Sequence, residues 1–275
     1  GSVFLVLSPR IFAESFYNDK DIVFLSFFIF TIFFSIKFLK NINYQNAFML
    51  SLFSAFLINI RVIGIYMVIL IVFFLIIKIS MKNNFIFKKI NILIFFLFFN
   101  FVFLFIFWPF LWEAPIENFL YAIKSFSKYP WGGQVFYLGN FYKAEHLPWH
   151  YSSVYFFATT SLFLILTIVS GLWLITSRFI KRLFAINENQ IYKDIWRGDK
   201  ENILLFIFFT FVTPLLLIFL FNSIIYNGWR HLYFLFPSLV LMGVYFIDVM
   251  VLINSKKKFA IIFPIILSVV CINNL

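Results

Sequence analysis

The chain has 275 residues, a net charge of +11 and a mean hydropathy of +0.99, and only 12% of its residues are charged. Soluble domains carry about 25% charged residues, so the composition excludes a soluble globular domain and indicates a protein embedded in lipid. Excess positive charge is typical of the cytoplasmic loops of membrane proteins, and we expect no nucleic-acid partner. The single cysteine, Cys271, excludes an internal disulfide and a cysteine-based metal site.

Apolar runs of about 20 residues predict membrane-spanning helices along the chain. Gln45–Ile79 is too long for one such helix and contains Arg61, so we expect two helices with a break near Ile60–Gly64. The other spans are expected at Ile22–Leu39, Ile90–Trp108, Tyr155–Thr176, Ile203–Phe221, Leu232–Ile253 and, beginning a further one, Ala260–Ile272. The pattern predicts an all-α, polytopic transmembrane helical bundle of about eight spans, forming a single domain over residues 1–275.

Basic residues divide unequally between the two sides of this predicted bundle. With Arg10–Asp21 placed outside, about fifteen Lys and Arg residues fall on one face and about seven on the other, as the positive-inside rule requires. Residues 178–202 then form a cytoplasmic loop and residues 109–153 a large outer loop. The outer loop is too polar to span and rich in Trp and Tyr, which favour the membrane interface. We expect it to fold back onto the membrane surface and help cover a site.

Both ends of the sequence run into apolar segments. The chain begins with Gly-Ser, continues directly into Val3–Leu7 and ends at Leu275 beside another apolar run. We therefore expect a fragment of a longer, multi-pass protein of the bacterial inner membrane, whose upstream spans are missing.

Carboxylates gather in Ser8–Asp21, just before the first complete span. Glu14 and Asp21 are the candidate catalytic residues, because a carboxylate at that depth can act as a general base or bind a cation. Asp21 directly precedes the apolar run, whereas Asp19 is further into the loop. The alternative for Asp21 is a purely structural role at the helix N-terminus.

Basic residues on the same predicted face are candidates for binding a phosphate. Arg61 interrupts an apolar segment, where a cation is costly and suggests function, although a snorkelling arginine at a helix end is the alternative. Arg230 and His231 lie in the turn YNGWRHLY, and an arginine fork suits phosphate oxygens. An incidental cation in an aromatic turn is the alternative there.

The segment HLPWHY contributes His150 and Tyr151, which we include with His231 among the predicted substrate-binding residues. Pro148 between His146 and His150 argues against a helical metal pair. The metal requirement is open: no cofactor is certain, and a divalent cation remains possible. No nucleotide-binding loop, HExxH or GxSxG pattern is present.

Six segments in order resemble the bacterial glycosyltransferase family 39-like proteins, relatives of dolichyl-phosphate-mannose protein mannosyltransferases and of the lipid A aminoarabinose transferase. They are SPRIFAESFYNDKDI, INIRVIGIY, WPFLW, YPWGG, LPWHY and NGWRHLYFLFP. The resemblance covers most of the chain and implies a GT-C fold that transfers a sugar from a polyprenyl-phosphate carrier on the outer face. It also implies a catalytic base in a first outer loop that this chain lacks, with Asp21 as the second-loop carboxylate and Arg61 and Arg230 as phosphate contacts.

The predicted function is therefore an integral-membrane glycosyltransferase, with a polyprenyl-phosphate-linked sugar as donor and a lipid, glycan or protein as acceptor. Because the first outer loop is missing, we expect the fragment alone to be inactive. The alternative is a transporter or flippase of a lipid-linked or anionic solute. A transporter should place ionisable residues near the membrane midplane, often within inverted repeats, and no repeat is visible.

Overall fold

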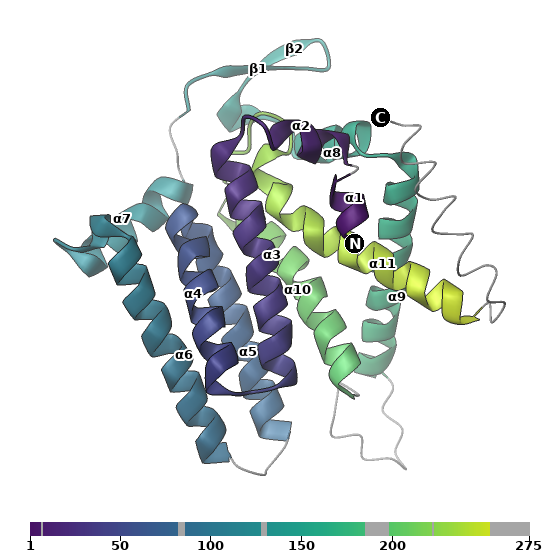
Figure 1. Ribbon diagram of the computed structural model, residues 1–275. Helices are drawn as coiled ribbons and strands as arrows, with labels where there is room; N and C mark the ends of the chain where they lie inside the picture. The colour runs from purple at the N-terminus through teal and green to yellow at the C-terminus, as the bar shows by residue number, and fades with distance from the viewer. Residues whose placement is uncertain (7, 82–85, 128–130, 185–197, 222, 254–275) are drawn as a thin grey trace. The chain divides into compact units, whose positions relative to one another are not determined.

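The computed structural model describes residues 1–6, 8–81, 86–127, 131–184, 198–221 and 223–253, and this part of the chain is largely helical (Figure 1). Six of its helices are long and apolar enough to cross a membrane: Asp19–Lys40, Val62–Ile79, Lys89–Phe107, Leu162–Lys181, Glu201–Leu220 and Arg230–Leu252. These helices indicate an all-α, multi-pass membrane protein.

Internal contacts divide the chain into two compact units. The first unit comprises Gly1–Ile22, Gly133–Arg197 and Ile225–Leu275, and the second comprises Val23–Gly132 and Gly198–Ile224. The boundary after Ile22 falls within a helix, α3 (Asp19–Lys40).

The second unit consists of most of α3 together with α4 (Tyr44–Ile60), α5 (Ile65–Met81), α6 (Ile86–Phe107), α7 (Pro115–Ser127) and α10 (Gly198–Leu220). Local sequence explains where two of these helices begin. Asp19 and Asp21 lie in the first turn of α3 and Lys37 and Lys40 in its last turn, which complements the helix dipole at both ends. Asn43 caps α4 by accepting a hydrogen bond from the backbone N–H of Asn46 at 2.8 Å.

The predicted break within Gln45–Ile79 is confirmed. Arg61 adopts an extended backbone that ends α4, and a 3₁₀ turn, Val62–Gly64, leads into α5. A Cβ atom on Gly64 would lie 2.9 Å from the Leu57 side chain, so this close turn requires glycine. The buried Asn100 of α6 then donates hydrogen bonds to Ser54 Oγ at 2.7 Å and to the Ser51 carbonyl at 3.2 Å, which joins α6 to α4 where water is excluded.

The two ends of the second unit differ in character. At one end, Asn59 donates a hydrogen bond to the Phe107 carbonyl at 2.6 Å, so the Arg61 turn lies beside the start of the 109–153 loop. At the other end, Lys78 donates to the carbonyl of Leu39, next to Lys40. This arrangement agrees with the sides that the charge count gives to these segments.

The first unit contains α1 (Ser2–Val6), α2 (Pro9–Glu14), α8 (Tyr151–Thr159), α9 (Leu162–Phe184) and α11 (Phe236–Ile253), with 3₁₀ segments η3 (Ala144–His146) and η4 (Arg230–Leu235). α9 and α11 pack very closely at Gly171. A Cβ atom at this position would lie only 2.1 Å from the carbonyl oxygen of Met242, so only glycine fits there. Strands β1 (Gln134–Tyr137) and β2 (Asn140–Lys143) form an antiparallel hairpin. Its two-residue turn, Leu138–Gly139, has positive φ at both positions, as a type I′ turn does.

The prediction of one span over Tyr155–Thr176 is wrong at its start. α8 ends at Thr159, Thr160 is extended, and the spanning helix begins only at Leu162. The 109–153 loop is also more ordered than predicted, since it carries α7 and the hairpin. The predicted segment Ala260–Ile272, the lysines at 256–258 and most of the 178–202 loop lie outside the described residues.

Labelling from the two sides of the membrane tests the predicted orientation. With Cys271 replaced by serine, a cysteine at Glu113 should react with an impermeant thiol reagent from outside, and one at Asn41 only after the membrane is opened. Both positions are exposed and lie at opposite ends of the second unit. Reaction of both from the same side would contradict the assignment.

Candidate functional site

The two candidate carboxylates are held close together by the connection between α2 and α3. Pro9 occupies the first turn of α2, a position that suits its fixed φ, and Glu14 is the last residue of that helix. Asp21 lies one turn into α3. Both side chains are buried, with 3% of Glu14 and 4% of Asp21 exposed. Asp19, in contrast, is exposed as predicted, but it is the first residue of α3 and does not lie in the preceding loop.

Asn18 connects these two carboxylates. Its side-chain amide donates to Glu14 Oε2 at 2.8 Å and to Asp21 Oδ2 at 3.1 Å. Its Oδ1 atom accepts the backbone N–H of Asp21 at 3.0 Å, the geometry of an N-cap. Asn18 is therefore the cap of α3, and Asp21 lies in the first turn of that helix. The Asp21 carboxylate points into a network of side chains.

Arg10 and Tyr233 complete the surroundings of Glu14. Arg10 forms an ion pair with Glu14 Oε1 at 2.9 Å and donates a hydrogen bond to the Tyr233 hydroxyl at 2.7 Å. Tyr233 in turn donates to Glu14 Oε1 at 3.1 Å. Burial disfavours the charged guanidinium, but the hydrogen bond that Arg10 donates to the Tyr233 hydroxyl and the charge of Glu14 outweigh this effect and raise the pKa of Arg10. Arg10 therefore stays a cation beside the buried Glu14.

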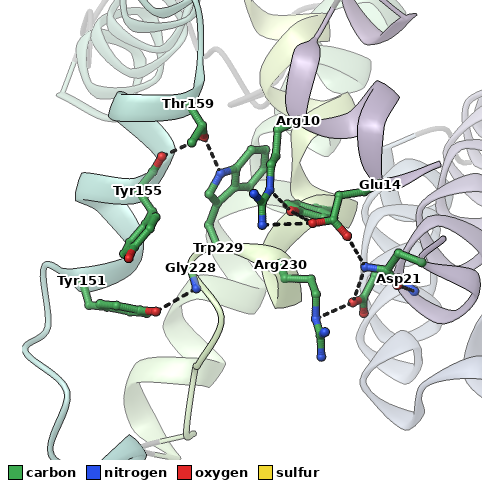
Figure 2. Close-up of polar contacts among 11 residues, drawn as sticks. Arg10, Glu14, Asp21, Tyr151, Tyr155, Thr159, Gly228, Trp229 and Arg230 are labelled. Carbon is green, nitrogen blue, oxygen red and sulfur yellow. Dashed lines mark hydrogen bonds and ion pairs between the residues drawn. The ribbon is translucent and has the colours of Figure 1, made fainter. Parts of the chain in front are cut away.

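Arg230 supplies the corresponding cation for Asp21. Its Nε atom lies 2.9 Å from Asp21 Oδ2 in an ion pair, and the arginine side chain remains 32% exposed. Figure 2 shows the resulting series of contacts from Arg10 through Glu14 to Asp21 and Arg230. The two guanidinium groups balance the charge of the two carboxylates. This pairing allows the carboxylates of Glu14 and Asp21 to be buried.

The turn that carries Arg230 is fixed by α8. Asn227 and Gly228 both have positive φ, and the backbone N–H of Gly228 donates to the Tyr151 hydroxyl at 2.8 Å. The indole N–H of Trp229 donates to Thr159 Oγ1 at 2.8 Å (Figure 2). Tyr151, predicted to bind substrate, thus positions the turn beside Arg230. Burial raises the pKa of Tyr151, which keeps its hydroxyl neutral.

The other predicted residues, His150, His231 and Arg61, each lie against an aromatic ring. His150 directly precedes α8, with its ring 5.8 Å from that of Tyr137. His231 packs against Tyr226 with ring centres 4.7 Å apart. Arg61 belongs to the second unit, where its guanidinium lies 5.9 Å from the centre of the Phe24 ring. A pairing of Arg61 with Asp21 stays a prediction.

Sequence reasoning missed Arg10, Asn18, Tyr233 and Thr159. The i, i+4 spacing of Arg10 and Glu14 is a readable signal of a helical ion pair. Asn18 also stands where an N-cap belongs, three residues before Asp21. Nothing local identifies Tyr233, whose partners Arg10 and Glu14 are more than 200 positions away.

The described residues contain no group of three or more His, Cys, Asp or Glu side chains arranged to hold a metal ion. Both carboxylates in the network already accept contacts from side chains. A divalent cation therefore stays a prediction without a formed site in this part of the chain.

Comparisons with protein-family models, with curated proteins and with solved structures find no match to this chain. Its class, a multi-pass helical membrane protein, rests on the six apolar helices.

Removing the Tyr233 hydroxyl tests whether the network is energetically important. Tyr233→Phe should lower the free energy of unfolding in detergent by about 1–3 kcal/mol, because it leaves Glu14 and Arg10 short of a buried partner. Tyr44→Phe is the control, since Tyr44 is exposed, and it should change stability by less than about 0.5 kcal/mol. Equal effects of the two substitutions would contradict the expected contribution of the hydroxyl.

Proposed function

We propose that the chain is part of an integral-membrane glycosyltransferase with a GT-C-like bundle of about eight spans. It moves a sugar from a polyprenyl-phosphate carrier to a lipid, glycan or protein acceptor on the non-cytoplasmic face. The observation that supports this proposal best is the buried network that joins Glu14 and Asp21 to Arg10 and Arg230.

Arg230 is suited to bind the carrier phosphate. Its Nε atom lies 2.9 Å from Asp21 Oδ2, so the ion pair holds the guanidinium by its inner nitrogen. Since the side chain is 32% exposed, its two terminal nitrogens can form a fork to an incoming anion. Neutralising phosphate charge makes polyprenyl phosphate a better leaving group.

Asp21 is suited to act on the acceptor. In the proposed reaction, the acceptor oxygen forms a bond to the anomeric carbon while the bond from that carbon to the phosphate oxygen breaks. The acceptor hydroxyl loses its proton to a carboxylate, and the phosphate leaves with the electron pair. Asp21 orients that hydroxyl or a divalent cation beside the carboxylate that acts as base, and Glu14 holds Arg10 and Asn18 in place.

The remaining predicted residues have supporting roles in this proposal. Arg61 is a second phosphate contact, and His231 and His150 border the donor. Tyr151 acts by holding the turn before Arg230. The four charged residues of the network lie in the short segments α2 and η4 and in the first turn of α3, which favours chemistry near the interface over a transporter's midplane site.

Replacement of Arg230 tests the phosphate contact. Arg230→Lys keeps the charge but loses the planar fork, so it should weaken binding of a polyprenyl phosphate to this chain by about 1.5–3 kcal/mol. Binding can be measured by titration in nanodiscs. Lys143→Ala removes an exposed cation from the same unit and should leave affinity unchanged. Unaltered affinity in Arg230→Lys and Arg230→Ala would remove Arg230 from the site.

Replacement of Asp21 tests the catalytic assignment. Asp21→Asn should reduce turnover of the full-length enzyme by about 10²-fold or more, the lower range of a general acid–base contribution. Folding should persist because asparagine is nearly isosteric and Asn18 still caps α3. Asp19→Asn, at an exposed position two residues away, should have near wild-type turnover. If Asp21→Asn also turns over normally, Asp21 has only a structural role.

A further inference from the structure

Helix α7 has three distinct faces. Phe119 packs against Trp108 with ring centres 6.2 Å apart, and Asn118 donates a hydrogen bond to the Phe110 carbonyl at 2.6 Å. This side of α7 fastens the helix to the end of α6. Figure 1 shows α7 beside the C-terminal end of α6.

A second face of α7 is apolar and exposed. Ile116, Leu120 and Ile123 follow one another at helical spacing, with 77%, 52% and 38% of their surfaces exposed. The third face carries Glu117 and Lys124, two turns apart and both exposed. An apolar stripe beside a charged stripe on a short helix is typical of a helix lying in the membrane interface.

The apolar face has a lipid-facing neighbour in the same unit. α6 exposes Ile94, Phe98 and Phe101 at helical spacing along a predicted span, and in a bilayer such a surface contacts acyl chains. Only residues 108–114 separate that span from α7, and Trp112 among them is 57% exposed. Tryptophan at this level is typical of the boundary between acyl chains and headgroups.

We propose that α7 binds the membrane surface, with Ile116, Leu120 and Ile123 inserted at the boundary between headgroups and acyl chains and Glu117 and Lys124 in water. The occupant of the apolar stripe is lipid. Interfacial helices insert their apolar faces by about 5–10 Å. This binding role does not depend on glycosyl transfer.

Site-directed fluorescence tests the inserted face. Single cysteines at Leu120 and Ile116, in the full chain with Cys271→Ser, are labelled with an environment-sensitive dye. The protein is reconstituted into phosphatidylcholine–phosphatidylglycerol vesicles. The emission of both labels should shift to shorter wavelength. Lipids that carry a quencher near the headgroup end of the acyl chain should remove most of this emission, whereas iodide in the water should remove little of it. A label at Glu117, on the same helix, should show the reverse response.

Two results would overturn the proposal. If iodide quenches the Leu120 and Ile116 labels as strongly as the Glu117 label, the stripe faces water. If neither lipid quencher nor iodide reaches them, protein covers the stripe, and the occupant is a second copy or another partner. Because Ile116 and Leu120 are exposed, the cysteine variants should fold, and their unchanged melting temperatures check this.

Discussion

Two buried carboxylates constrain how the first unit is built. A carboxylate removed from water needs a cation and hydrogen-bond donors, or it takes up a proton. Arg10 and Arg230 provide the cations, and Asn18 provides donors to both. Each arginine must then be held in position, which the Tyr233 hydroxyl and the α8-anchored turn achieve. The geometry of α2, α8, η4 and the start of α3 thus follows from one electrostatic requirement.

The helical framework was largely predictable because a segment that crosses the lipid bilayer needs an apolar sequence of a certain length. A span must be long and apolar, and its backbone must bond to itself, so Arg61 within Gln45–Ile79 marked the break between α4 and α5. The start of α9 was misplaced because Tyr155–Thr159 is as apolar as a span. The helix instead ends at Thr159, whose hydroxyl accepts the Trp229 indole N–H, a tertiary contact that hydropathy does not register.

The site was only partly predictable. Glu14, Asp21 and Arg230 stand out as charges beside apolar runs, and the structure brings these three into one network. Their connection through Tyr233 depends on tertiary contacts between distant segments. Tyr151 illustrates the remaining difficulty: sequence marked it as a ligand-binding residue, whereas its hydroxyl holds a backbone amide. A polar aromatic residue near a membrane surface suits either role, and only the identity of its neighbour distinguishes them.

The separation of the network's members along the chain has a consequence for biosynthesis. Arg10 and Tyr233 are 223 residues apart, so at about 5–20 residues per second the ribosome needs roughly 10–45 s to supply the partner. Glu14 and Asp21 therefore enter the translocation machinery long before Tyr233 and Arg230 exist. During that interval Glu14 already has Arg10 and Asn18 as partners, whereas Asp21 lacks its cation and is stable only in water or in protonated form. The network can consequently be completed only after Arg230 and Tyr233 have been synthesised, and a chain truncated before residue 230 leaves Asp21 without Arg230 and Glu14 without Tyr233.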